Sequence, residues 1–333
     1  MAMISFVIPV YNSEKTVEEV VRRITATVES LPERVRYEII LINDSSRDSV
    51  YDICLRLGRE RPDVVRPFCL SKNFGQSRAI MAGFHMVRGD YVVCLDDDLQ
   101  TIPEEFPKLY NKLLEDRLDV VFGYYEHKQH SRFRNFGTWL NERMQGFILN
   151  KPASLRTSTY FVARRYVVDQ IVQYDRPFPY IEGLLLLMTG SIASIPIRHD
   201  KRHYGRSGYS FGKLVDLWFN GFTNFSVRPL RIASVLGAVS ALAAFVMMIA
   251  FFIARLAGSN DPAGWASTIV IVLFIGGVQL ICVGLLGEYI GRIYLSVNRT
   301  PQFIIRPESF PAQAPSAPAE ADGAGLREGG AAR

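Results

Sequence analysis

Short apolar runs alternate with amphipathic stretches from Ile4 to Asp116. Runs rich in β-branched residues predict strands at Ile4–Val10, Tyr37–Asn43, Val64–Leu70 and Tyr91–Asp96. Helical spacing of apolar residues predicts helices at Glu14–Ser30, Val50–Glu60, Gln76–Met86 and Pro103–Asp116. Because strands that alternate with helices are typical of a mostly parallel sheet covered on both faces, the pattern predicts an α/β fold.

Polar residues stand where each predicted strand ends. They are Tyr11-Asn12, Asn43-Asp44, Ser71-Lys72-Asn73 and Asp96-Asp97-Asp98, in strand order. Ligands of open α/β sheets bind outside the carboxyl ends of the strands. We therefore expect a ligand site at this edge of the sheet.

Two long apolar stretches follow in the second half of the chain. Ile232–Ala254 is a run of 23 uncharged residues, and a second stretch runs from Trp265 to Leu286. As helices, each would be ~30 Å long or longer, enough to cross the hydrocarbon core of a bilayer. The sequence therefore predicts transmembrane helices at 231–256 and 265–288.

The segments around these stretches predict the remaining organisation. Residues 210–230 combine basic with aromatic and aliphatic side chains, which is typical of an amphipathic helix lying along a membrane surface. Residues 289–306 are expected to be a cytoplasmic juxtamembrane segment, and 307–333, rich in Pro, Ala and Gly, a disordered tail. Residues 1–209 then form the α/β domain.

Charge and cysteine content narrow the function classes. The chain has a net charge of +5 and four cysteines, none of them in a CxxC pair. This cysteine pattern argues against a zinc site and a disulfide framework, and suits a reducing cytoplasm. Beside two predicted spans, the basic charge favours anionic lipid headgroups over nucleic acid as the partner. Residues 256–265 contain no Lys or Arg, so the positive-inside rule places both chain ends in the cytoplasm.

The acidic run Asp96-Asp97-Asp98 carries the strongest chemical signal. Neighbouring carboxylates repel each other and call for a cation, and in an extended segment Asp96 and Asp98 project to one side. Such hard oxygen ligands suit Mg²⁺ or Mn²⁺ bridging a diphosphate. The alternative is a solvated acidic turn that caps the helix beginning at Pro103.

Four motifs together resemble glycosyltransferase family 2, whose members have the GT-A fold. They are Val7–Glu14, Ile42–Asp44, Asn73–Gln76 and Asp96–Gln100, in this order. Arg202–Tyr209 and Gly284–Arg292 are similar to elements of one branch, the polyprenyl-phosphate glycosyltransferases. This branch includes bactoprenol glucosyltransferases, undecaprenyl-phosphate aminoarabinose transferases and dolichol-phosphate mannose synthase. The resemblance spans Ile4 to Arg306.

The resemblance implies roles for individual residues. Pro9, Tyr11, Asn12, Glu14, Asp44, Lys72 and Asp97 would bind the nucleotide, with Asp44 at the base. Asp96 and Asp98 would hold the metal and the diphosphate, with Gln100 close to the sugar. Phosphate and acceptor binding would fall to Arg132, Arg134, Arg202, Ser207 and Tyr209, with Arg202 also a catalytic candidate. For each arginine the alternative is a solvated or headgroup-binding surface.

The resemblance also implies the reaction. We expect inverting transfer of one sugar from a nucleotide-diphosphate sugar, with UDP favoured, to undecaprenyl phosphate at the inner face of a bacterial cytoplasmic membrane. This would serve a cell-envelope glycan or lipid A, and the resemblance leaves a homo-oligomer open. No strong candidate for a base is present, as expected for a phosphate acceptor that is already ionised. Glu182 falls where soluble relatives keep a base.

Two alternatives stay open. One is an enzyme like dolichol-phosphate mannose synthase that uses GDP-mannose, and the other is a catalytically silent membrane scaffold. The segment Leu155–Phe161 lacks the acidic residues that relatives have there, so the identity of the transferred sugar does not follow from any of these relatives. A processive polysaccharide synthase is disfavoured because no Gln-x-x-Arg-Trp motif occurs.

Overall fold

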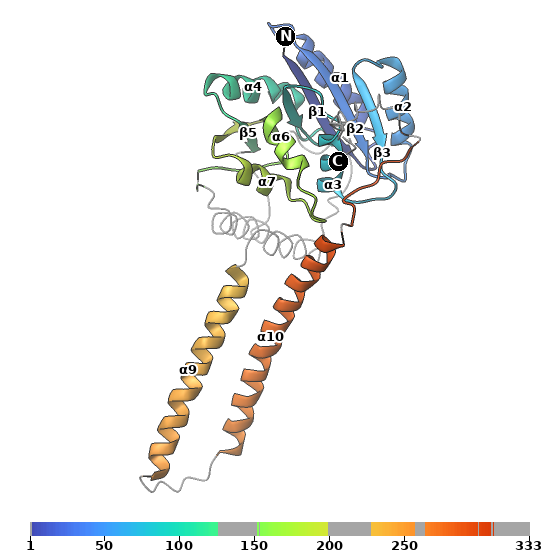
Figure 1. Ribbon diagram of the computed structural model, residues 1–333. Helices are drawn as coiled ribbons and strands as arrows, with labels where there is room; N and C mark the ends of the chain where they lie inside the picture. Colours follow the sequence, from blue (N-terminus) through green and yellow to red (C-terminus); the bar gives the residue numbers. More distant parts are fainter. Residues whose placement is uncertain are drawn as a thin grey trace, which may run out of the picture.

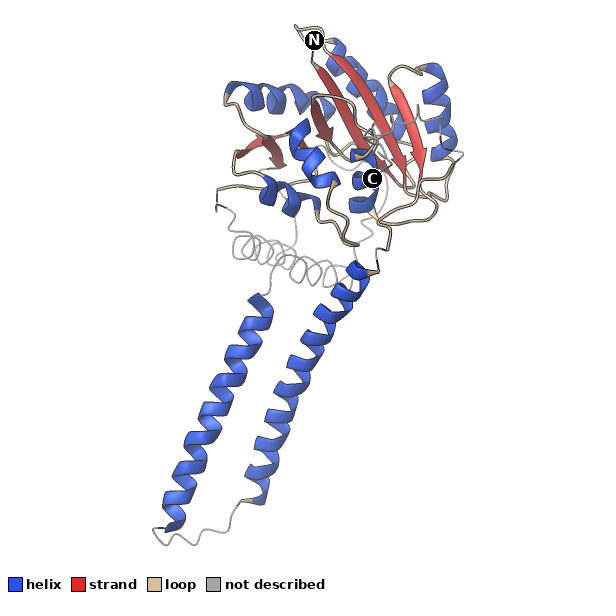
Figure 2. Cartoon of the chain, viewed as in Figure 1, coloured by secondary structure: helices blue, strands red, loops and turns tan. Residues whose placement is uncertain are grey.

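The residues that the structure describes up to 198 form a twisted sheet with helices on both faces (Figure 1). The computed structural model describes residues 2–125, 152, 154–198, 228–256, 264–298, 300–307 and 309. The seven strands are ordered β3 (Val65–Cys69), β2 (Arg36–Asn43), β1 (Met3–Val10), β4 (Tyr91–Cys94), β6 (Phe161–Arg164), β5 (Val120–Tyr125) and β7 (Ile192–Ile197). The first four are mutually parallel, and β6 runs antiparallel between β4 and β5. The predicted α/β fold is confirmed (Figure 2).

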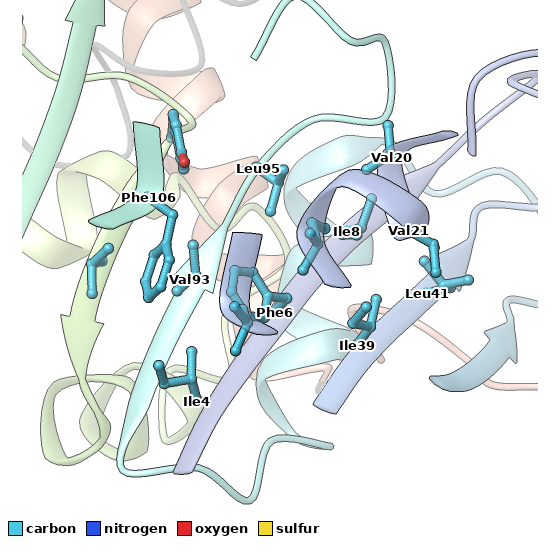
Figure 3. Packing of buried hydrophobic residues seen from close by; sticks show 14 of the residues in the cluster. Ile4, Phe6, Ile8, Val20, Val21, Ile39, Leu41, Val93, Leu95 and Phe106 are labelled. Carbon is cyan, nitrogen blue, oxygen red and sulfur yellow. The ribbon is translucent and has the colours of Figure 1, made fainter. Parts of the chain in front are cut away.

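Each face of the sheet has its own layer of helices. One face is covered by α1 (Val17–Glu29), α2 (Val50–Glu60) and α4 (Phe106–Glu115), the last preceded by a 3₁₀ turn, η1 (Pro103–Glu105). The other is covered by α3 (Gln76–Phe84), α6 (Arg165–Val172) and α7 (Ile181–Met188). Ile4, Phe6 and Ile8 of β1 point into the first layer beside Phe106 (Figure 3), whereas Val7 points into the second. This alternation follows from the two-residue period of a strand.

The four predicted strands and four predicted helices all form, with ends that differ from the predicted ones by at most a few residues. The last predicted helix is divided into η1 and α4, and the fourth strand ends at Cys94 rather than Asp96. Leu95 and the three aspartates are thus in a loop, which frees their backbone to turn. The antiparallel β6, its neighbour β5 and the edge strand β7 were not predicted from the sequence.

Two long helices extend away from the sheet as a hairpin (Figure 1). They are α9 (Arg228–Leu256) and α10 (Trp265–Val297), and the Cys282 sulfur on α10 lies 3.9 Å from the Ala233 carbonyl oxygen on α9. Within the described residues, one helical stretch, Phe274–Val297, is long and apolar enough to cross a membrane by length and composition. It begins and ends later than the predicted span at 265–288. That both helices are transmembrane stays a prediction.

The chain returns to the α/β domain after α10. The Ser71 amide donates to the Ile304 carbonyl at 2.8 Å, and the Arg306 amide donates to the Cys69 carbonyl at 2.8 Å. Residues 289–306, predicted as a juxtamembrane segment, therefore comprise the end of α10 and a segment paired antiparallel beyond β3. Contact continues past residue 307, where we predicted the tail to begin, because Ser309 is buried against Cys69. Most of the predicted interfacial segment, 210–227, lies outside the described residues.

Candidate active site

Asp96 occupies the loop that follows β4, at the carboxyl edge of the sheet. One of its carboxylate oxygens accepts a hydrogen bond from Gln76 Nε2 at 2.7 Å, and the other accepts one from Thr159 Oγ1 at 2.8 Å. Burial raises the pKa of Asp96 to about 7, with the charges of Asp98 and Asp97 adding to the shift. The sequence identified Asp96 but missed both of its partners.

Asp97 points to a different neighbour. Its carboxylate accepts a hydrogen bond from the Tyr11 amide at 3.0 Å, which joins the loop after β4 to the loop after β1. Burial raises the pKa of Asp97 to about 6. Tyr11 itself remains 45% exposed, so its ring is accessible to a ligand. Asp97 is thus placed to orient Tyr11, the residue predicted to contact a nucleotide.

Asp98 and Gln100 form a local turn. Asp98 accepts hydrogen bonds from the Gln100 amide at 3.1 Å and from Gln100 Nε2 at 2.7 Å. Leu99 between them has a φ of 60°, a left-handed conformation that reverses the chain. Asp98 and Gln100 are therefore joined within a bent loop, two residues after Asp96. The predicted roles of all three at the metal and the sugar stay predictions.

The loops after β1 and β2 are joined by reciprocal hydrogen bonds. Asn12 accepts from the Arg47 amide at 2.9 Å, and its own amide donates to Ser46 Oγ at 3.1 Å. Glu14 accepts from Ser49 Oγ at 2.8 Å, and this bond lowers the pKa of Glu14. Asn12 and Glu14 thus shape the predicted nucleotide pocket through contacts within the protein. Pro9 is buried inside β1, beside Ile42 of β2.

Asp44 lies beneath the loop that precedes α3. Its side chain is 3% exposed, and its two oxygens accept hydrogen bonds from the Phe74 amide at 2.7 Å and the Gly75 amide at 2.8 Å. Burial raises the pKa of Asp44, and these two hydrogen bonds oppose the shift. Gly75 has a φ of 92°, which favours glycine. Lys72 Nζ lies 5.1 Å from the centre of the Phe74 ring, at the rim of the same loop.

Glu182 lies in the first turn of α7, near the acidic loop. Burial raises the pKa of Glu182, and its charge in turn contributes to the raised pKa of Asp96. The position predicted for a base is therefore close to the carboxylates. Its catalytic role stays a prediction.

The predicted phosphate-binding residues flank the last two strands in the sequence, before β6 and after β7. Arg132, Arg134, Arg202, Ser207 and Tyr209 all lie outside the described residues. Arg198, the last described residue before 228, donates from its Nε to the fully buried Glu105 at 2.6 Å. This ion pair joins the end of β7 to Glu105 in η1, the 3₁₀ turn that follows the acidic loop.

The carboxylate oxygens of the acidic loop fit a divalent cation whose coordination is completed by a bound diphosphate. Among the described residues, no group of three or more His, Cys, Asp and Glu side chains is arranged as a ready-made metal site. Asp96 and Asp98 offer hard oxygen donors. Mg²⁺ is commonly bound by one or two such carboxylates, with substrate phosphates supplying further ligands. The residues therefore fit a metal that binds together with a diphosphate.

Solved structures similar to this chain include two sugar transferases of phosphoglycerate. Mannosyl-3-phosphoglycerate synthase from Rubrobacter xylanophilus is 18% identical, with a TM-score of 0.49 over 69% of this chain and 74% of that one. Glucosyl-3-phosphoglycerate synthase from Mycobacterium tuberculosis, with Mn²⁺ and UDP-glucose bound, is 21% identical, with a TM-score of 0.44 over 66% and 77%.

Sequence comparisons reach much further along the chain. The model of glycosyl transferase family 2 matches residues 5–172, and the model of the GtrB C-terminal hairpin matches residues 228–293. The undecaprenyl-phosphate 4-deoxy-4-formamido-L-arabinose transferases of Salmonella dublin and Salmonella enteritidis are each 34% identical over 94% of this chain and 95% of theirs. The resemblance to polyprenyl-phosphate glycosyltransferases is thereby confirmed. The chain belongs to glycosyl transferase family 2 and is a glycosyltransferase.

Proposed function

We propose that this enzyme transfers a single sugar from a UDP-sugar to undecaprenyl phosphate, with inversion at the anomeric carbon. The observation that carries the proposal is the Asp96–Asp98 loop at the carboxyl edge of the sheet, in a chain that also has the C-terminal helical hairpin of this family. The curated relatives, similar over nearly the whole chain, are named for an undecaprenyl-phosphate sugar transfer. Their sugar is not assigned to this enzyme.

Asp96 and Asp98 are the residues that would hold Mg²⁺ or Mn²⁺ beside the donor diphosphate. When bound, the cation supplies positive charge that stabilises the leaving nucleoside diphosphate. The protein contributes the exposed ring of Tyr11 for the base, and the loops fixed by Asn12, Glu14 and Asp44 to shape the pocket. Gln100, held against Asp98, is the side chain we expect closest to the sugar.

The acceptor needs charge compensation more than a base. A phosphate monoester is already anionic at neutral pH, because its second pKa is about 6. Arginine pairs with phosphate oxygens bidentately, so Arg132, Arg134 and Arg202, assisted by Ser207 and Tyr209, are the proposed acceptor-binding groups. The hairpin of α9 and α10 would keep this site at the surface of a bacterial inner membrane, with the catalytic domain in the cytoplasm.

The test is transfer by the full-length protein purified in detergent. A panel of nucleotide sugars is incubated with undecaprenyl phosphate and Mn²⁺, and the lipid product is identified by mass spectrometry. We expect one UDP-sugar to give a product of undecaprenyl phosphate plus one sugar, and EDTA or Asp98→Ala to abolish it. Asp63→Ala, which removes an exposed acid on the α2–β3 connection, is the matched control and retains activity.

The same assay discriminates the alternatives. If only GDP-mannose gives a product, the donor is not a UDP-sugar and the enzyme is similar in function to dolichol-phosphate mannose synthase. Transfer to a soluble sugar but to no polyprenyl phosphate would overturn the lipid acceptor. Unchanged activity in EDTA would remove the metal from the proposal.

A further inference from the structure

Two side chains from distant parts of the chain converge on Asp96. Gln76 is the first residue of α3, and Thr159 precedes β6. Each donates one hydrogen bond to a different oxygen of the same carboxylate, at 2.7 and 2.8 Å. A carboxylate accepts about four hydrogen bonds or metal contacts, so each oxygen keeps a further site for a cation.

Thr159 stands on a firmly held segment. Ser158 Oγ donates to the Gly123 carbonyl at 2.5 Å, and the Gly123 amide donates to the Tyr160 carbonyl at 2.9 Å. The Tyr160 side chain is 1% exposed. The hydroxyl of Thr159 is therefore presented to Asp96 from backbone that is fixed on both sides.

Gln76 is held in a comparable way. Asp44 binds the two amides immediately before it, those of Phe74 and Gly75. The helix that Gln76 begins packs closely on β1, since a Cβ atom at Gly83 would overlap Val7 Cγ1. The backbone from which the Gln76 side chain projects is thus held by the same buried Asp44 that shapes the nucleotide loop.

We propose that Gln76 and Thr159 are positioning residues that orient the Asp96 carboxylate toward the divalent cation. The inference rests on the proposed function, because it takes Asp96 and Asp98 as the metal ligands. The terminal torsion of an aspartate is broad, and repulsion from Asp97 and Asp98 favours rotation of Asp96 away from them. Two donors, one on each oxygen, oppose that rotation before the metal arrives. Groups that hold metal ligands in this way commonly change metal affinity about 10- to 100-fold when they are lost.

The experiment measures Mn²⁺ affinity directly. Mn²⁺ is titrated into the full-length protein in detergent, with and without UDP, and free Mn²⁺ is followed by electron paramagnetic resonance. Thr159→Val and Gln76→Met keep the approximate side-chain size and remove the donor. We expect each to weaken Mn²⁺ binding about 10- to 100-fold, and Thr159→Ser, which keeps the hydroxyl, to restore it. Transfer assays should show the same loss as a higher Mn²⁺ requirement.

Thr27→Val is the matched control. Thr27 is 6% exposed on α1, and its hydroxyl donates to the Arg23 carbonyl at 2.7 Å, far from the acidic loop in sequence. It should bind Mn²⁺ as the wild type does. Wild-type Mn²⁺ affinity in Thr159→Val and Gln76→Met, with Asp98→Ala impaired, would overturn the inference and leave the metal site standing. Wild-type affinity in Asp98→Ala would instead show that the proposed metal site itself is wrong, and the inference would fall with it.

Discussion

Asp96, Asp97 and Asp98 are consecutive carboxylates with three separate sets of partners. Asp96 is bound by Gln76 and Thr159, Asp97 by the amide of Tyr11, and Asp98 by Gln100. The loop therefore spreads like charges in different directions, which lowers their mutual repulsion. It also means that a single acidic run contacts the loop after β1, the start of α3 and the segment before β6.

The raised pKa of Asp96 predicts how the metal-free protein responds to pH. Burial raises this pKa from 3.8 to about 7, so between these values the folded state holds a proton that the unfolded state releases. Stability must then fall as pH rises from about 4 to about 7. In EDTA, we expect the Tm of the wild type to decline across this window more steeply than that of Asp96→Asn. Parallel profiles for the two proteins, measured by thermal unfolding in detergent, would contradict the assignment.

A buried ion pair lies at the opposite edge of the sheet from the candidate active site. Breaking it should lower the stability of the protein and leave ligand binding unchanged. Glu38, 1% exposed near the start of β2, accepts hydrogen bonds from Arg66 Nη1 at 2.7 Å, Ser5 Oγ at 2.6 Å and the Arg88 amide at 2.7 Å. Glu38→Ala leaves the Arg66 charge buried without its partner, which costs about 3–5 kcal/mol of the free energy of unfolding.

Urea unfolding of the full-length protein in detergent measures this loss. Glu38→Gln keeps the shape and an acceptor, so it should be destabilised less. Binding of UDP at a temperature where both variants are folded should match the wild type, because Glu38 lies at the amino ends of the strands. A Glu38→Ala protein as stable as the wild type would show that the pair contributes nothing.

The sequence predicted which residues gather at the site better than it predicted what they contact. Asp44, Asp96 and Asp98 were placed at the carboxyl edge because strand ends are readable from hydrophobic runs. Thr159 was missed because its contact with Asp96 depends on β6 pairing with β4, and nothing local in the sequence sets that register. Gln76 belongs to the Asn73–Gln76 motif, but the spacing of the motifs does not show that its side chain contacts Asp96.

At the scale of elements, the early βα units were predictable and the late strands were not. Each of the first four strands is a separate apolar run, whereas β6 leads directly into α6 without a turn signal and β7 is partly exposed. The segment after α10 was also missed, since its contact with the end of β3 joins residues more than 230 positions apart. Antiparallel pairing of such a short segment leaves no periodic signal.

That segment predicts different outcomes for two truncations. Gln302 Nε2 donates to the carbonyl oxygens of Tyr174 and Arg176, and Ile304 accepts from Ser71, next to Lys72. A chain ending at Ser309 keeps these contacts, whereas a chain ending at Thr300 loses them. Each lost hydrogen bond costs about 0.5–1.5 kcal/mol, so the shorter chain should have a clearly lower Tm and, with the loop after β3 released, weaker UDP binding. Equal Tm and UDP affinity for the two truncations would contradict this role.

At the scale of the whole molecule, the hairpin is predicted to hold the catalytic domain on one side of the membrane. The start of α9 and the end of α10 lie at the end of the hairpin nearer the α/β domain, and the end of α9 and the start of α10 lie at its far end (Figure 1). If both helices cross the bilayer, the domain and both chain ends share one side. The absence of Lys and Arg from 256–265 predicts that this side is the cytoplasm.

Cysteine labelling in intact cells tests this arrangement. Cys54, Cys69 and Cys94 are buried, and Cys282 lies within α10, so the wild type should give little background with a membrane-impermeant maleimide. Ser259→Cys, in the connection between the helices, should be labelled from outside, and Glu33→Cys, exposed on the α/β domain, only after the cells are opened. The reverse pattern would invert the topology and place the acidic loop away from cytoplasmic nucleotide sugars. Labelling of both positions only in opened cells would mean that the hairpin does not cross the membrane, and the enzyme would then have to reach its lipid acceptor from one leaflet without a spanning anchor.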